Sequence, residues 1–279
     1  MRWIKLSIVF LLFFCLFTMV QEGEVQAAVS KQIFVTVEIN GSPIKMDVQP
    51  YIINGRTYVP LRFVVEALGA DVHWEPEERK AIITCDDKDI EMFVDNNILL
   101  VDEIEQPMDT NIEIVDGRIM IPIRFIAENL GCSVEWDGLV FSVLIEKEGV
   151  EVPQECIYER KYTDEDLIWL ARIINVEGGG LSLDARLAIA NVVINRKESP
   201  RFPDSICDVI FDTRYSVQFP PAHRESFKEL VPSKECIISA KMALEGINNI
   251  DNALFFNNVP FKSSSVTLYK IIDGMYFYF

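Results

Sequence analysis

The residue best placed for acid–base chemistry in this 279-residue chain is Glu177, which stands between two apolar helical patterns. In the first pattern, apolar residues fall at i, i+3, i+4 and i+7, which predicts one buried stripe on a helix. These residues are Leu167, Leu170, Ala171 and Ile174. Glu177 lies at the edge of the stripe, in the last turn before the three glycines 178–180. The negative end of the helix dipole and the apolar flank both disfavour a carboxylate, so both should raise its pKa.

A glutamic acid with a raised pKa can act as a general acid near neutral pH, which makes Glu177 the candidate catalytic residue. The alternative is a solvated glutamate at a helix end, with no chemical role. Spacing within the helix does not decide between these two interpretations.

Two helices must position this side chain. Thr163, followed by three acidic residues, predicts the start of the first helix, because a hydroxyl caps it and acids suit its first turn. Ser182 predicts the cap of a second helix over 183–197, which is apolar on nearly every side and is therefore a core helix. Asn191 and Asn195 are its polar exceptions, and each is either a satisfied buried amide or a substrate ligand.

Further along, prolines and polar residues punctuate the chain between shorter elements. Short helices are expected over 205–211 and 233–246, the second with a glycine stop at Gly246. The segment 214–221 (RYSVQFPP) is aromatic, polar and stiffened by proline. It fits either the wall of a cleft or an ordinary surface loop.

The first half of the chain contains an internal repeat. The segment 55–74 (GRTYVPLRFVVEALGADVHW) reappears 62 residues later as 117–136 (GRIMIPIRFIAENLGCSVEW), without a gap and with half of the positions identical. In each unit, Asn54-Gly55 or Asp116-Gly117 predicts a tight hairpin turn. A proline then opens a short helix, which ends at Gly69 or Gly131 in the left-handed region, and strands follow. Two such α+β units can bury a shared core.

Composition and the N-terminal segment indicate the class of protein, the partners that can be excluded and the expected cellular location. Hydrophobic residues make up 49% and charged residues 25%, as in ordinary globular proteins. The net charge of −17 argues against nucleic acid as a partner, since phosphates require a basic face. Residues 1–27 combine a cationic start, an apolar run and small residues before Ala27, which predicts a cleaved signal peptide and a secreted protein without a membrane anchor.

The spacing of the cysteines and histidines does not match that of a metal site. Five cysteines would remain after cleavage, an odd number without a CxxC spacing, and a Cys207–Cys236 disulfide is left open. The only two histidines, His73 and His223, lie far apart in sequence, so we expect no metal and no other cofactor. A metal-dependent amidase is disfavoured for the same reason.

The repeat resembles the copper amine oxidase-like N-terminal (stalk) domain, whose units carry the pattern NGR-x-x-VP-x-R-x-x-x-E-x-LG-x-x-V-x-W. The resemblance covers 31–146 and implies a presenting or binding module, because the imidazole cluster of a copper oxidase is missing. The charged, proline-containing segment 147–161 is expected to be a linker.

The segment 162–279 resembles the SleB-type cell wall hydrolase domain, through LARIINVEGGG, DARLAIANVVINR, YSVQF and DNALFFN. The resemblance implies a mainly helical, lysozyme-like domain with a small β element, acting on peptidoglycan at the cell wall or spore cortex. It places the catalytic acid at Glu177. Substrate contacts are implied for five further residues: Tyr215, Ser216, Gln218, Phe256 and Asn257. The chain as a whole is thus expected to be α+β.

Three departures from the family pattern affect the expected mechanism. The second acid of E-A-x-G-E is replaced by Leu181, the region after FFN lacks a tryptophan, and the usual terminal histidine motif is replaced by IDGMYF. Because glycoside hydrolysis normally uses two carboxylates, a lone acid favours a lytic transglycosylase that cleaves MurNAc–GlcNAc bonds. The alternatives are a non-catalytic or weakly active wall-binding protein, and a hydrolytic muramidase or glucosaminidase with Asp184, Asp204 or Asp212 as the second carboxylate.

Overall fold

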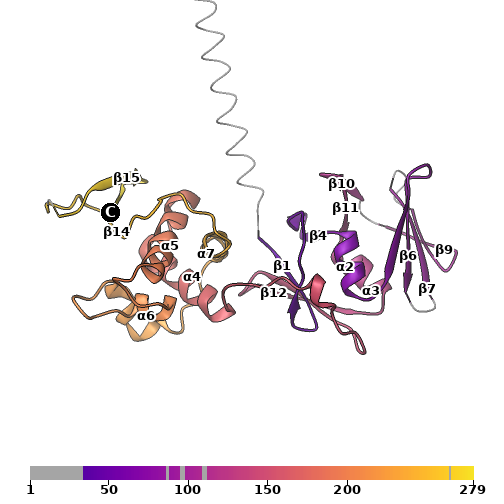
Figure 1. Ribbon diagram of the computed structural model, residues 1–279, viewed down its shortest axis with the longest axis horizontal. Helices are drawn as coiled ribbons and strands as arrows, with labels where there is room; N and C mark the ends of the chain where they lie inside the picture. Colours follow the sequence, from indigo (N-terminus) through magenta and orange to yellow (C-terminus); the bar gives the residue numbers. More distant parts are fainter. Residues whose placement is uncertain (1–33, 86–87, 95–97, 109–111, 264) are drawn as a thin grey trace, which may run out of the picture.

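The computed structural model describes residues 34–85, 88–94, 98–108, 112–263 and 265–279. The predicted signal peptide lies outside these residues. Figure 1 shows two parts side by side along the long axis, with the sheets of the repeat at one end and a group of helices at the other. The α+β organisation expected from the sequence is confirmed. Within the described residues no helix is long and apolar enough to cross a membrane.

The two repeat units meet in one antiparallel sheet with the strand order β10-β11-β4-β3. Its strands are β3 (Tyr51–Ile53), β4 (Arg56–Pro60), β10 (Glu113–Val115) and β11 (Arg118–Pro122). At its centre Val59 faces Ile121, which is the equivalent residue of the other unit. A second pair of equivalent residues, Tyr51 and Glu113, is joined by a hydrogen bond, in which the Tyr51 hydroxyl donates to Glu113 Oε2 at 2.7 Å. The sequence repeat therefore builds a local two-fold axis through this sheet.

Both hairpins turn at the dipeptides predicted from the sequence. Asn54 and Gly55 have φ values of 51° and 75°, and Asp116 and Gly117 have 50° and 75°. Two consecutive positive φ values are typical of the type I′ turn, which matches the twist of the flanking strands.

Each hairpin leads into a seven-residue helix, α2 (Leu61–Ala67) or α3 (Ile123–Asn129). Pro60 and Pro122 are the N-cap residues of these helices, one position before the first helical position that was predicted for them. Each proline is also the last residue of the preceding strand. The helices end where predicted, since Gly69 and Gly131 adopt φ values of 78° and 79°.

An outer sheet follows each helix. The first unit continues into a five-stranded meander, β5-β6-β7-β8-β9. These strands are β5 (Asp71–Glu75), β6 (Lys80–Cys85), β7 (Lys88–Phe93), β8 (Ile98–Val101) and β9 (Ile104–Gln106). The second unit forms β12 (Ser133–Asp137) and β13 (Ser142–Glu146), and the N-terminal strands β1 (Thr36–Ile39) and β2 (Ser42–Pro43) complete its sheet. Because β1 pairs in parallel with β13, the start and end of the domain are held together.

The segment expected to be a linker is tied to the first domain by backbone hydrogen bonds. It contains a short 3-10 helix, η1 (Gln154–Cys156). Lys45 N donates to Cys156 O, and Tyr158 N donates to Pro43 O, both at 2.8 Å.

The second half of the chain is built around three longer helices with a small sheet. The longer helices are α4 (Asp164–Gly178), α5 (Leu183–Glu198) and α7 (Lys234–Leu244). A short helix, α6 (Ile206–Ile210), and the 3-10 turns η2 (Pro220–His223) and η3 (Glu225–Phe227) lie between α5 and α7. The strands β14 (Phe255–Asn257), β15 (Leu268–Ile272) and β16 (Met275–Tyr278) form a sheet with the order β14-β16-β15. Thr163 and Ser182 cap α4 and α5 as predicted, Thr163 within a capping box with Asp166.

Two questions left open by the sequence are answered inside this domain. Asn191 Nδ2 donates to Ile247 O, and Asn195 Nδ2 donates to Asp251 O and Ala253 O. Both are therefore satisfied buried amides rather than substrate ligands. Cys207 and Cys236 are free thiols, as are the three other described cysteines, so the Cys207–Cys236 disulfide is not present.

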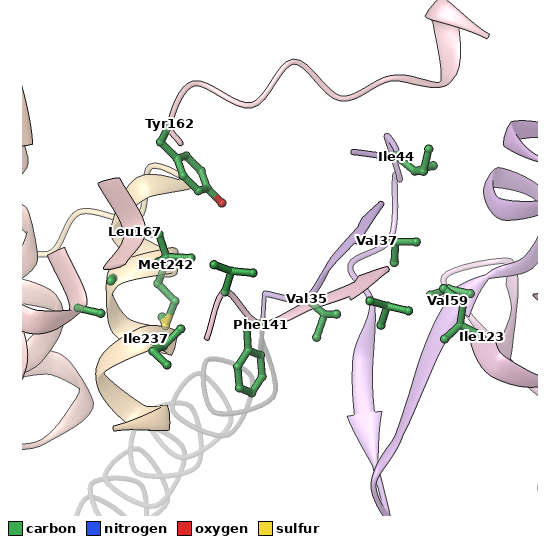
Figure 2. Close-up of a cluster of buried hydrophobic side chains, with 14 of the residues drawn as sticks. Val35, Val37, Ile44, Val59, Ile123, Phe141, Tyr162, Leu167, Ile237 and Met242 are labelled. Carbon is green, nitrogen blue, oxygen red and sulfur yellow. The ribbon is translucent and has the colours of Figure 1, made fainter. Parts of the chain in front are cut away.

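The two domains share a buried contact at which Lys241 of α7 is 1% exposed. Its Nζ donates to Val140 O and Phe141 O of the first domain, each at 2.9 Å. Figure 2 shows Phe141 lying between the strands of the first domain and the helix that carries Ile237 and Met242. Burial lowers the pKa of Lys241 to about 7, although Glu245 and other nearby acids oppose the shift.

This shift predicts a pH dependence of stability. Between pH 7 and the ordinary lysine value of 10.5, the unfolded chain binds more protons at Lys241 than the folded chain, so stability should rise with pH. The contribution is at most about 1.4 kcal/mol per pH unit. Urea denaturation at pH 7 and pH 9 should show this rise, and Lys241→Met should remove it. Replacing the exposed Lys234 of the same helix should leave the rise intact, and an unaltered rise in Lys241→Met would contradict the assignment.

Candidate active site

Glu177 lies in the last turn of α4, as predicted, where the helix ends at Gly178. Gly178 is fully enclosed, and a Cβ atom there would collide with the side chain of Ile189 on α5. The two helices therefore approach closely directly beside the candidate acid, and a Cβ atom at this position would displace the end of the Ile189 side chain.

The Glu177 side chain is half-buried, and burial raises the pKa of its carboxyl above the ordinary value of 4.5. The positive charge of Arg196 opposes this shift without cancelling it. Among the described residues, no hydrogen bond or ion pair engages either carboxyl oxygen. The proton and the oxygens of Glu177 are thus available to a substrate.

Arg196, near the end of α5, is a residue beside the candidate acid that the sequence analysis did not single out. It is 4% exposed, and its Nε donates to Leu254 O at 2.7 Å. Its guanidinium lies 5.1 Å from the ring centroids of both Phe202 and Phe219. The signal in the sequence was a cationic residue at a buried position of α5, one residue after Asn195, on a helix whose other buried positions are mostly apolar.

Arg196 remains a cation despite this burial. Desolvation lowers its pKa to about 10, while Asp212 and Glu177 oppose that shift. One of its terminal nitrogens, NH1, is buried without a hydrogen-bond partner among the described residues. An unpaired donor on a buried cation attracts negative charge, so Arg196 favours the ionised form of any carboxyl nearby.

Three aspartates were considered as a second carboxylate, and they differ in environment. Asp184 and Asp204 are exposed. Asp212 is buried, and it accepts hydrogen bonds from Nε, NH2 and the backbone N–H of Arg214, each at 3.0 Å. These bonds hold the pKa of Asp212 below its ordinary value, so it stays ionised. Leu181, where the family pattern has an acid, is half-buried next to α5.

The residues predicted to contact substrate fall into two groups. Phe256 and Asn257 lie on β14, and the Phe256 ring packs 6.2 Å from that of Phe219, which also faces Arg196. This aromatic contact joins Phe256 to the Glu177–Arg196 region. Asn257 is half-buried, and its side-chain oxygen accepts from Asn258 N.

The other three residues lie on the exposed loop before Phe219. Tyr215 is 90% exposed, and Gln218 Nε2 donates to Ser216 Oγ at 2.9 Å. Within the described residues, no hydrogen bond or ring contact joins this loop to Glu177. Phe256 is therefore linked to the candidate acid only through Phe219 and Arg196. In the loop, Tyr215 and Ser216 are exposed and Gln218 is half-buried.

The altered C-terminal motif forms a tight hairpin that reaches the candidate site. Asp273 and Gly274 connect β15 and β16 with φ values of 50° and 76°. The Asp273 carboxylate accepts the backbone N–H of Ser182 at 2.7 Å, which anchors the hairpin at the start of α5. The sequence that replaces the family's terminal histidine motif thus supports the loop that follows Glu177.

A copper or other metal centre does not fit the residues present. His73 lies on β5 of the first domain, whereas the His223 ring packs 5.8 Å from Phe211 in the second. Within the described residues, no three His, Cys, Asp or Glu side chains converge as metal ligands would.

Comparisons with known proteins agree with these two domains. Residues 38–145 match the family model described as Copper amine oxidase N-terminal domain, and residues 180–278 match the one described as Cell Wall Hydrolase. The second match begins three residues after Glu177. A comparison with curated proteins gave no match.

Two solved structures are similar to the C-terminal part of the chain. One is the catalytic domain of the germination-specific lytic transglycosylase SleB from Bacillus anthracis, with 25% identity and a TM-score of 0.38 over 43% of this chain and 99% of that one. The other is the catalytic domain of the Bacillus cereus SleB protein, with 24% identity and a TM-score of 0.37 over 42% of this chain and 91% of that one.

The two family matches lie one after the other along the chain, first the copper amine oxidase N-terminal domain and then the cell wall hydrolase. They confirm both resemblances noted in the sequence.

The raised pKa of Glu177 predicts how a neutral substitution changes stability. Below the ordinary carboxyl value of 4.5, Glu177 is protonated in both folded and unfolded chains, so Glu177→Gln should match the wild type. As pH rises, the unfolded chain ionises first and binds fewer protons, so the wild type loses stability and the variant does not. Thermal melts at pH 4 and pH 7.5 should show the variant more stable only at the higher pH. Equal melting temperatures at both pH values would contradict a raised pKa.

Proposed function

We propose that the protein is a lytic transglycosylase that cleaves the MurNAc–GlcNAc bonds of peptidoglycan, with Glu177 as its single acid and base. The observation that carries the proposal is the Glu177 carboxyl, which is half-buried, unpaired and raised in pKa beside the buried cation Arg196. The cell wall hydrolase family of the C-terminal domain supports peptidoglycan as the substrate. We further propose that the enzyme acts outside the cytoplasm, at the cell wall or spore cortex.

The chemistry needs one carboxyl group in two protonation states. Protonated Glu177 donates its proton to the glycosidic oxygen, and the bond between that oxygen and muramyl C1 breaks. The resulting carboxylate then removes the proton from the muramyl 6-hydroxyl, whose oxygen attacks C1 and closes a 1,6-anhydro ring. Glu177 ends protonated, and no water is consumed.

The surroundings of Glu177 suit both halves of this cycle. Burial raises the pKa of the carboxyl and so favours the protonated form that the first step requires. Arg196 then favours the carboxylate that forms when the proton leaves, because its positive charge is buried and only weakly screened. Phe256 and Asn257, together with Tyr215, Ser216 and Gln218, are the proposed glycan contacts.

The test is a digest of purified peptidoglycan, with mass spectrometry of the released fragments. The wild type should release fragments with 1,6-anhydromuramic ends, and Glu177→Gln should release at least about 10²-fold less, since the general acid is lost. Reducing ends in place of anhydro ends would instead indicate hydrolysis, with Asp212 as the buried second carboxylate. If the wild type released no more fragments than Glu177→Gln, the proposed enzymatic activity would be contradicted and a wall-binding protein would be favoured.

The role of Arg196 predicts a shift in the pH profile. Arg196→Met replaces the buried cation with an apolar side chain, so the pKa of Glu177 should rise further. The alkaline limb of the pH–activity profile should move to higher pH, while maximal activity falls roughly tenfold because the carboxylate loses its counter-charge. Arg201→Met is the matched control, since the Arg201 guanidinium also lies near Phe202 and Phe255 but is exposed. If the alkaline limb of the Arg196→Met profile lay at the same pH as that of the wild type, this role of Arg196 would be contradicted.

A further inference from the structure

A cavity of about 670 Å³ lies where the two repeat units and the helical domain meet. The first unit contributes Arg56 from β4, and the second contributes Arg124 from α3 and Trp136 from β12. The helical domain contributes Lys234 from the start of α7. The volume falls within the range of about 300–1,000 Å³ that is usual for sites of small ligands. None of these residues belongs to the candidate active site.

Aromatic rings form one wall of this junction cavity. The Phe141 ring packs edge-on against Trp136, with ring centroids 4.9 Å apart, and the Lys234 ammonium lies 5.3 Å from the Phe141 centroid. Phe141 is buried, whereas Trp136 is 42% exposed. The wall therefore has a fixed base and an open indole surface.

The repeat provides an internal comparison for that exposure. Trp74 occupies the equivalent position in the first unit, at the same place in the same motif. Trp74 is half-buried and packs against the hydrophobic core, so in that unit the tryptophan serves the fold. In the second unit the same residue type faces a cavity, which leaves its apolar face and its indole N–H open to a ligand.

The charges around the cavity indicate the chemistry of that ligand. The chain carries a net charge of −17, yet three cations line this cavity, namely Arg56, Arg124 and Lys234. Two acids, Glu128 and Glu135, also line it, and Glu128 forms an ion pair with Arg124 at 3.3 Å. Because Arg124 is engaged by Glu128, the charge that the cavity offers to a ligand is the Lys234 ammonium beside Phe141, which complements a carboxylate.

We propose that the junction cavity is a second glycan-binding site, which takes an amino-sugar chain bearing carboxylates. The C–H face of a sugar ring packs on Trp136, and Lys234 contacts the carboxylate. Peptidoglycan supplies both groups in one polymer, as alternating amino sugars whose muramyl lactyl carboxyls are free wherever the stem peptide has been removed, and its choice as the source rests on the proposed function. The cavity holds the strand while the active site of the adjoining domain cleaves it.

The experiment measures binding in the Glu177→Gln protein, so that turnover does not interfere. The probe is a soluble tetrasaccharide of alternating GlcNAc and MurNAc, titrated by calorimetry, with chitotetraose as a neutral probe that lacks the carboxyls. Adding Trp136→Ala should weaken binding at one site by about tenfold or more for both probes, as loss of an aromatic anchor does. Trp136→Phe should recover part of the affinity. Lys234→Gln, at an exposed position, should weaken binding of the MurNAc-containing probe alone.

Leu139→Ala is the matched control for Trp136, because Leu139 is 47% exposed on the same β12–β13 turn and lies outside the cavity lining. Affinity and stoichiometry that are unchanged in both Trp136→Ala and Lys234→Gln would overturn the proposal. Equal weakening of both probes by Lys234→Gln would overturn the carboxylate contact. Because binding is read without turnover, this outcome is separate from that of the anhydro-end assay.

Discussion

A buried guanidinium is the constraint on which the candidate site depends. Arg196 is almost fully enclosed, and a cation in that position requires compensation from its surroundings. Phenylalanine rings, the Leu254 carbonyl and the charges of Asp212 and Glu177 supply it. The α5 helix, the loop before η2 and the strand β14 are therefore arranged around one side chain, and Glu177 takes part in that arrangement.

The same arrangement explains how one carboxyl can serve as both acid and base. Burial at the end of α4 favours the protonated form, whereas Arg196 favours the ionised form. The two influences oppose each other, and burial is the larger, so the pKa of Glu177 is raised above its ordinary value while Arg196 limits the rise. A site with two free carboxylates would not need this balance, because each group could keep one role.

The sequence predicted the elements that carry local signals and missed what depends on packing. The turns at Asn54-Gly55 and Asp116-Gly117, and the caps at Thr163 and Ser182, are determined by neighbouring residues, so they could be read directly. The parallel pairing of β1 with β13 joins segments more than a hundred residues apart, and no local pattern indicates it. Arg196 was missed for a similar reason, since its aromatic partners Phe202, Phe219 and Phe255 come from three separate segments. The exposure of Trp136 was also hidden, because the repeat makes it look identical to Trp74.

The central claim is that the Glu177 carboxyl is held partly protonated by its surroundings, and a direct titration tests it. In protein labelled with ¹³C at glutamate side chains, NMR would follow the Glu177 carboxyl carbon across pH, with Glu177→Gln to assign its signal. The account predicts a pKa clearly above the ordinary value of 4.5. A pKa at or below 4.5 would contradict it, because Glu177 would then be an ordinary solvated glutamate at a helix end.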